Sequence, residues 1–177
     1  LVDFDSSGAN MHTCFGLKLS DRNLRNYFSN HSNKKSRLAD FIQGTDVPRV
    51  SMIQGFWDSW SANEFSVEQL EQFMTDCKSA PYDYVLIDLG AGAQTTNLEV
   101  FRRADEKILI CNPEPTTVEK TYRFIEAFIC CEIKENANSD SRKDLENTLR
   151  KYREQFHAQP FSFRNFLAGQ EISYNHL

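Results

Sequence analysis

The sequence predicts an α/β fold, with a doubly wound, mostly parallel sheet and helices on both faces. Residues 84–87 and 107–111 are nearly continuous apolar runs, which is typical of strands buried on both faces of a parallel sheet. Each run is followed by polar residues and then Gly or Pro, as in the loops where such sheets bind ligands. Helical patterns alternate with the strand patterns along the chain, which favours the doubly wound arrangement.

Composition limits the class of protein. The chain has 177 residues, of which 40% are hydrophobic, enough for one domain with a sizeable core. Its formal net charge of -5 argues against a protein that binds nucleic acid through its overall field. Its five cysteines have no C-x-x-C spacing, so neither a disulfide framework nor a zinc site is indicated, and a reducing, cytosolic compartment is favoured.

The first residues resemble the end of a strand. In residues 1–5, Asp3 and Asp5 point to the same side by the period of two, and a turn containing Gly8 follows. Two carboxylates so placed repel each other unless a cation or a water network lies between them. The alternative is that both are solvated turn residues and that Asp5 caps a helix.

The next elements are short. Helical turns are expected at residues 10–17, 23–28 and 37–42, with a polar loop at residues 30–35. Residues 49–54 alternate between apolar and polar side chains and are expected to form a strand.

Two longer helices carry clear signals. Ser66 and Gln69 form a capping box for a helix that continues to about Lys78, and Thr116 or Thr117 caps a later helix. The apolar side chains that mark one face are Phe65, Leu70, Phe73 and Cys77 in the first helix and Val118, Tyr122, Ile125 and Ile129 in the second.

Residues 132–160 are predicted to form a charged loop and an amphipathic surface helix within the single domain, residues 1–177. The apolar positions of this helix are Leu145, Leu149, Tyr152 and Phe156. Its polar face carries charges of both signs, which favours a helix covering the sheet over a membrane or partner helix.

Four further side chains have two interpretations. Trp57 and Trp60 form either a core wedge or a partner contact, and the core is favoured. Cys14 and Cys111 are either reactive thiols near a cleft or small buried side chains, and burial is favoured.

Five segments together carry a resemblance to a known family. They are V-D-F-D-S-S-G-A-N-M-H-T-C-F-G, D-F-I, V-S-M-I-Q-G, Y-D-Y-V-L-I-D-L-G-A-G and N-P-E-P-T-T-V-E-K-T-Y-R-F-I, in this order. From residue 1 to about residue 128 the chain resembles the MinD/ParA group of deviant-Walker P-loop ATPases, and within it the flagellar-number regulators of the FleN/FlhG type. Each motif alone is weak, and the set is specific to the group.

The resemblance implies roles for several residues. Asp5 matches the switch I aspartate that orients the attacking water, Asp3 matches the strand aspartate beside it, and Asp88 matches the Walker B carboxylate that holds Mg²⁺ through water. Gly90 and Gly92 lie in the segment that matches switch II, where a glycine amide senses the γ-phosphate. These roles suit phosphoryl transfer, which depends on a positioned metal, an oriented water and charge neutralisation.

The resemblance also implies a place for the nucleotide base. Asn112, Pro113 and Glu114 match a loop that lies near the base in relatives. The implied cofactors are therefore ATP and Mg²⁺.

The sequence departs from the family pattern in one large respect. No G-x-x-x-x-G-K-[ST] motif or variant occurs in it, so the phosphate-binding loop is missing. The expected fold is therefore P-loop NTPase-like but incomplete at both ends, and the chain is expected to be an internal fragment of a longer protein. Without the P-loop strand the sheet would have an exposed gap with unpaired backbone groups, and this segment alone is expected to be poorly stable and not to hydrolyse ATP.

The resemblance implies a cytoplasmic ATPase switch. Such a switch binds Mg-ATP, forms an ATP-dependent homodimer and regulates or positions a protein partner, as in control of flagellar number, division site or cargo placement. Recruitment to a membrane surface through a segment outside these residues is a further possibility, and DNA partitioning is disfavoured by the acidic balance. The alternative is a non-catalytic scaffold that keeps the fold and binds a partner.

Overall fold

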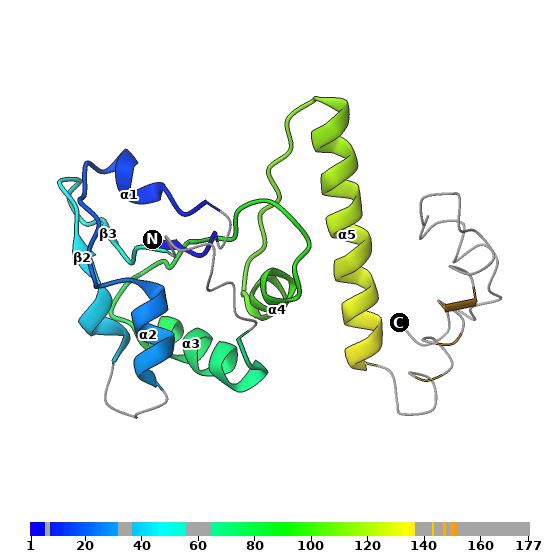
Figure 1. Ribbon diagram of the computed structural model, residues 1–177, viewed down its shortest axis with the longest axis horizontal. Coiled ribbons are helices and arrows are strands. Elements are labelled where there is room, and N and C mark those ends of the chain that lie inside the picture. The colour runs from blue at the N-terminus through cyan, green and yellow to red at the C-terminus, as the bar shows by residue number, and fades with distance from the viewer. Residues whose placement is uncertain are drawn as a thin grey trace. The chain divides into compact units, whose positions relative to one another are not determined.

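The computed structural model describes residues 1–5, 8–31, 37–55 and 65–136, together with Lys143, Asn147, Arg150 and Lys151 (Figure 1). The chain divides into two compact units, Leu1–Asn112 and Pro113–Leu177. The single domain expected from the sequence stays a prediction, and each unit is described by itself.

The first unit contains a small parallel sheet that positions the acidic residues. Strand β1 (Val2–Asp3) pairs in parallel with β4 (Ile87–Asp88), in the register that places Asp3 opposite Asp88. Val2 also forms a parallel bridge to Ile53 on its other side, so β1 has neighbours on both edges. The strand predicted at residues 84–87 is thus confirmed only at its end, where it extends one residue further.

A second sheet is antiparallel. Strands β2 (Gln43–Gly44) and β3 (Ser51–Met52) pair with each other, which confirms the strand expected at residues 49–54 but joins it to an unexpected partner. The described residues therefore contain two two-stranded sheets, and the continuous doubly wound sheet is not seen among them.

The prediction of a strand at residues 107–111 was wrong for the described structure. This segment forms no ladder with any described strand, and Ile108 and Ile110 are 73% and 85% exposed. The apolar run is present, but no neighbouring strand in the described residues supplies the backbone partners that a strand requires.

The helices of the first unit agree well with the sequence patterns. They are α1 (Met11–Cys14), α2 (Leu24–His31), the 3₁₀ helix η1 (Leu38–Phe41), α3 (Val67–Ser79) and α4 (Thr95–Arg103). All but α4 were predicted. Asn30 and His31, placed in a loop by the sequence patterns, continue α2.

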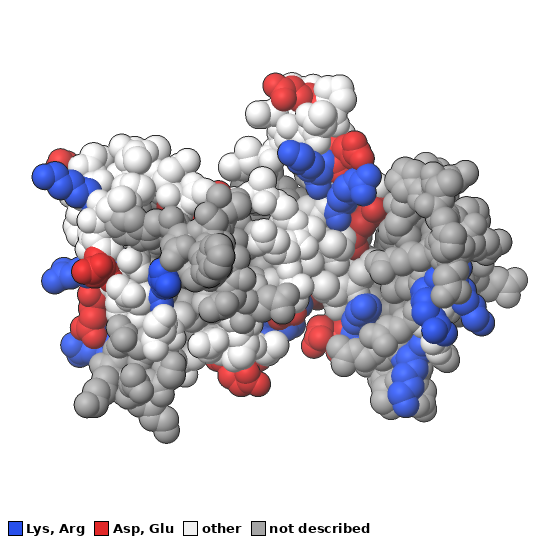
Figure 2. Space-filling view, viewed as in Figure 1, with Lys and Arg blue, Asp and Glu red and all other residues white. Residues whose placement is uncertain are grey.

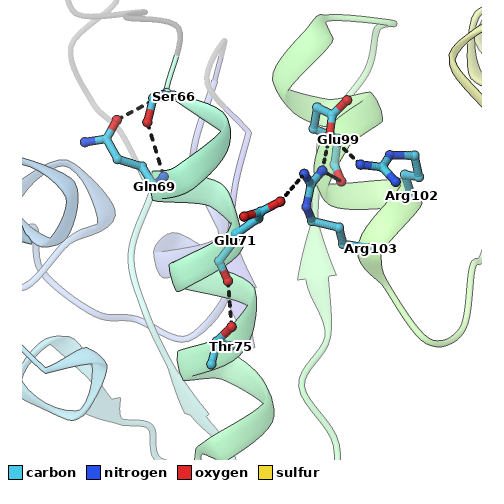
Figure 3. A network of polar contacts seen from close by, with 7 residues as sticks. All are labelled: Ser66, Gln69, Glu71, Thr75, Glu99, Arg102 and Arg103. Carbon is cyan, nitrogen blue, oxygen red and sulfur yellow. Dashed lines mark hydrogen bonds and ion pairs between the residues drawn. The ribbon is translucent and has the colours of Figure 1, made fainter. Parts of the chain in front are cut away.

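Helix α3 begins with the predicted capping box (Figure 3). Ser66 Oγ accepts a hydrogen bond from the Gln69 amide at 3.3 Å, and Gln69 Oε1 accepts one from the Ser66 amide at 3.0 Å. These two bonds satisfy amides that the first turn of a helix leaves without partners.

An aromatic cluster holds β1, α2 and α3 together. Phe4 follows β1 and packs on Phe73 of α3 with ring centroids 5.5 Å apart, and Tyr27 of α2 lies 5.9 Å from the same ring. Phe73 and Tyr27 are fully buried and Phe4 is 1% exposed. Burial of these three aromatic side chains against one another explains why α2 and α3 pack beside β1.

A polar network joins α3 to α4 (Figure 3). Arg103 forms ion pairs with Glu99 of its own helix and with Glu71 of α3, and Arg102 forms a second pair with Glu99. Burial acts to raise the pKa of Glu99, but the hydrogen bonds and charges of Arg103 and Arg102 outweigh it and hold that pKa below its ordinary value. Helix α4 is thereby fixed against α3.

The second unit contains α5 (Pro115–Asn136). The Glu114 carbonyl accepts hydrogen bonds from the Thr117 and Val118 amides at 3.0 and 2.9 Å. The helix therefore begins with Pro115 in its first turn, where a missing N–H costs nothing, and not at a threonine cap as predicted.

The charged segment at residues 132–160 starts differently from the expectation. Residues 132–136 continue α5 instead of forming a loop, and the four described residues beyond them are helical. The remainder of that segment, and Trp57 and Trp60, lie outside the described residues.

On the face shown in Figure 2, blue and red side chains are interspersed over the coloured part of the first unit. Both signs of charge are therefore present on this face. In the described ranges, no helix combines the length and the apolar character that crossing a membrane requires.

Candidate functional site

Three carboxylates belong to the carboxyl ends of two neighbouring strands. The parallel register of β1 and β4 aligns Asp3 with Asp88, and Asp5 follows two residues after Asp3. The carboxyl ends of adjacent parallel strands lie at the same edge of a sheet, where α/β proteins bind ligands. The structure therefore brings together the three acidic residues that the sequence singled out.

Asp3 is the buried member of the three. It is 1% exposed, and it accepts hydrogen bonds from the Met11 amide at 2.9 Å and from the Asp5 amide at 3.4 Å. Burial raises the pKa of Asp3; the two amide hydrogen bonds oppose this rise, and the charges of Asp88 and Asp5 add to it. The Asp3 carboxylate thus binds backbone amides of its own chain, and its bond to Met11 ties the start of α1 to the end of β1.

The structure bears on one alternative for the first loop, namely that Asp5 caps a helix. Asn10 is the N-cap of α1 and makes no side-chain cap bond; the Met11 amide at the start of that helix donates to Asp3 instead. Asp3 therefore binds the first amide of α1.

Asp5 lies against the loop that follows β4. A Cβ atom built on Gly90 would lie 2.6 and 2.7 Å from the two carboxylate oxygens of Asp5, and one built on Gly8 would lie 3.7 Å from Oδ2. The half-buried Asp5 carboxylate therefore occupies space that exists only because position 90 has no side chain.

Asp88 is exposed, as an acidic residue that meets a ligand must be. Its Oδ1 accepts a hydrogen bond from the Gly90 amide at 3.0 Å. Gly90 has a φ of 65°, in the left-handed region that glycine adopts without strain. At Gly92, the second glycine of this loop, the position that a Cβ atom would take is open, so a ligand can approach its backbone closely.

Two residues that support this arrangement were missed by the sequence analysis. Asn97 of α4 is 2% exposed and donates from Nδ2 to the Leu89 carbonyl at 2.8 Å, which ties the loop after β4 to α4. A Cβ on Gly55 would lie 2.5 Å from the Asp3 carbonyl oxygen and 2.6 Å from Ala9 Cβ. An Asn in the first turn of a helix after a glycine loop is a recognisable sequence signal. The Gly55 contact joins segments that are distant in the sequence, so no local sequence pattern indicates it.

The remaining candidates are placed as follows. Asn112 ends the first unit, and Pro113 and Glu114 begin the second; all three are exposed, and their role near a base stays a prediction. Cys14 and Cys111, for which burial was favoured, are both exposed, because α1 is short and residues 107–111 are not covered by another described strand.

The donor set fits a magnesium ion that arrives with a nucleotide. Among the residues with described positions, no group of three or more His, Cys, Asp or Glu side chains is placed to hold a metal by itself. Mg²⁺ usually keeps several waters and is bound through one or two carboxylates together with substrate phosphates. The exposed carboxylate of Asp88 suits that mode of binding and does not suit an all-protein metal cage.

Comparison with known proteins finds similarity to a solved structure. No protein-family model matches the sequence, and no curated protein matches it significantly. The septum site-determining protein MinD from Pyrococcus horikoshii OT3, solved in complex with Mg-ADP, is similar in structure, with 25% sequence identity and a TM-score of 0.56. The match covers 69% of this chain and 48% of the MinD chain, so this chain spans about half the length of that protein.

Proposed function

We propose that the chain is part of a MinD/ParA-like ATPase switch of the FleN/FlhG-like branch. The structural similarity to MinD supports the coarser part of this proposal, a MinD-like P-loop ATPase fold and a MinD-like ATPase kind of function. The complete protein binds Mg-ATP, forms a nucleotide-dependent homodimer and regulates or positions a protein partner. One observation carries the proposal: Asp3 and Asp88 are in register at the ends of two parallel strands, with Asp5 against the glycine loop that follows Asp88.

Each residue has a task in this proposal. Asp88 holds Mg²⁺ through a water molecule, and Asp5 accepts a hydrogen bond from the water that attacks the γ-phosphate. Asp3 keeps the loop that carries Asp5 in place through its bonds to the Met11 and Asp5 amides. Gly92 leaves room for phosphate oxygens to approach the backbone, and Gly90 leaves room for the Asp5 carboxylate. A Mg²⁺ ion held by Asp88 would supply charge neutralisation for the transferred phosphoryl group.

The proposal is tested in the protein expressed from the complete reading frame that contains these 177 residues. Asp88→Asn keeps the shape of the side chain but removes its charge. We expect Mg²⁺-dependent nucleotide binding to weaken by about 10-fold to 100-fold, the usual cost of losing a group that holds a metal through its outer shell, and ATP hydrolysis to fall with it.

Asp83→Asn is the matched control. Asp83 is also an exposed aspartate, and its partner is the exposed Arg49 at 3.4 Å, so its loss removes the same charge without touching the strand ends. Equal effects of the two substitutions, or no Mg²⁺-dependent binding by the unmodified protein, would overturn the proposal.

The second candidate is a scaffold that keeps the fold and binds a partner without hydrolysis; the 177 residues contain no G-K-[ST] loop. This candidate predicts a complete reading frame without such a loop. It also predicts that Asp88→Asn leaves partner binding unchanged, whereas the ATPase switch requires nucleotide for that binding.

A further inference from the structure

Gly90 meets two separate requirements in this structure. Its φ of 65° favours glycine, and its missing side chain leaves space for both carboxylate oxygens of Asp5, at 2.6 and 2.7 Å from an ideal Cβ position. Gly16 meets only the first requirement, because its φ is 63° and no heavy atom lies within 4 Å of its Cβ position. The contact with Asp5 is therefore a property of the site and not of left-handed glycines in general.

The contact joins two loops that are each fixed to their own strand. In the first loop, the carboxylate of Asp3 binds the Met11 amide at 2.9 Å. In the second, the carboxylate of Asp88 binds the Gly90 amide at 3.0 Å and Asn97 binds the Leu89 carbonyl at 2.8 Å. The packing of Asp5 on Gly90 is a direct contact from one loop to the other.

We propose that Gly90 is a positioning residue for Asp5: the two form a steric interlock, so that movement of the loop after β4 moves the Asp5 carboxylate with it. The Asp5 carboxylate fills the space beside the Gly90 α-carbon, so the loop after β4 cannot move toward Asp5 without displacing the carboxylate. The inference deepens the proposed function and rests on it in one respect, namely that Asp5 orients the attacking water. A phosphate group that draws the Gly90 amide away from Asp88 would then also change the position of the Asp5 carboxylate.

The test needs no nucleotide and uses the protein expressed from the complete reading frame that contains these 177 residues. Hydrogen exchange is followed by mass spectrometry in peptides that contain Met11, whose amide reports on the loop held by Asp3. Gly90→Ala and Gly16→Ala introduce the same methyl group at nearly the same φ, so their difference isolates the contact with Asp5.

We expect Gly90→Ala to speed exchange at Met11 about tenfold more than Gly16→Ala does, a coupling of the size found between residues in contact. In an Asp5→Ala background, which removes the carboxylate, this excess should disappear. In an Asp5→Asn background, which keeps the volume, it should remain. Equal exchange in the two alanine variants, or an excess that persists with Asp5→Ala, would overturn the interlock.

A variant that loses its fold is also informative. If Gly90→Ala removes protection from α3 as well, the interlock predicts that adding Asp5→Ala restores that protection, and failure to restore it contradicts the proposal. Because no ATP is used, a negative result here is distinct from a failure of Asp88→Asn to affect nucleotide binding.

Discussion

The segment around β1 and residues 107–111 have similar apolar character but different structures. Val2 and Phe4 are 2% and 1% exposed, whereas Ile108 and Ile110 are 73% and 85% exposed. The first segment lies in the aromatic core, and the second lies at the surface of the first unit. A hydrophobic run therefore becomes a buried strand only where other parts of the chain cover it and bind its backbone.

Backbone hydrogen bonds explain the difference. The Val2 and Phe4 amides donate to the Leu86 and Asp88 carbonyls at 2.8 and 2.7 Å, and the Asp3 amide donates to the Ile53 carbonyl at 3.1 Å on the other side. For residues 108–110 there is no backbone hydrogen bond in the described part of the chain. Within the described residues, the backbone of residues 108–110 therefore lacks the strand partners that Val2 has on both sides.

The largest effect is expected from breaking the buried region. Phe73→Ala removes a fully buried ring that packs on Phe4 and Tyr27, so the free energy of unfolding should fall by about 3–5 kcal/mol. Urea unfolding followed by circular dichroism measures this change. Ile110→Ala in the exposed segment should change it by less than about 0.5 kcal/mol, and similar losses in both variants would contradict the comparison.

A pH effect is expected from the same core. Burial raises the pKa of Tyr27, and the hydrogen bond to Asp76 at 2.8 Å and the charge of that residue raise it further. The folded state therefore disfavours the ionised phenol. Stability from this group is complete below the unfolded pKa of about 10 and is lost above it by about 1.4 kcal/mol per pH unit.

Tyr27→Phe removes this dependence at a cost of about 1 kcal/mol at neutral pH for the lost hydrogen bond. Urea unfolding at several pH values should show that the unmodified chain loses stability more steeply above pH 10 than the variant. Burial also raises the pKa of Cys77 to about 12, but that contribution is common to both proteins and cancels. Parallel pH profiles would show that Tyr27 is not the responsible group.

A smaller effect is expected at the start of α3. Ser66→Ala removes the side-chain bond to the Gln69 amide and should lower the free energy of unfolding by about 1 kcal/mol. Asn10 is the N-cap of α1 but makes no side-chain cap bond, so Asn10→Ala serves as the control and should have a smaller effect in the same urea experiment. A larger loss in the control would show that the capping box contributes little.

The smallest effect on stability is expected in the exposed region. Replacing Ile108 and Ile110 with Lys should change the free energy of unfolding by less than about 0.5 kcal/mol. Charged side chains on an unpaired strand edge oppose association, so self-association measured by light scattering should decrease.

The control adds the same two charges elsewhere. Leu19 and Val47 are exposed apolar side chains outside the unpaired run, and replacing both with Lys should leave more of the association in place. If both pairs of substitutions suppress association equally, net charge and not the exposed segment is responsible.

The candidate site was partly predictable. Asp3, Asp5 and Asp88 were identified because acidic residues follow apolar runs, and this pattern is visible within a few residues. The roles of Asn97 and Gly55 were not, because each depends on a contact with a segment that only the folded chain brings near. The hydrogen bond from the Met11 amide to Asp3 was also not predictable, because Asp3 and Asp5 fit the local sequence pattern equally well.

The sequence by itself determined the elements whose signals are local. The capping box of α3, the short helices α1 and α2 and the acidic ends of β1 and β4 all follow from spacing and from side-chain chemistry within one or two turns of chain. Only the tertiary structure decided that Asp5 packs on Gly90 and that residues 107–111 stay exposed. Both outcomes depend on which backbone lies alongside, and strand pairing is set by partners far away in the sequence.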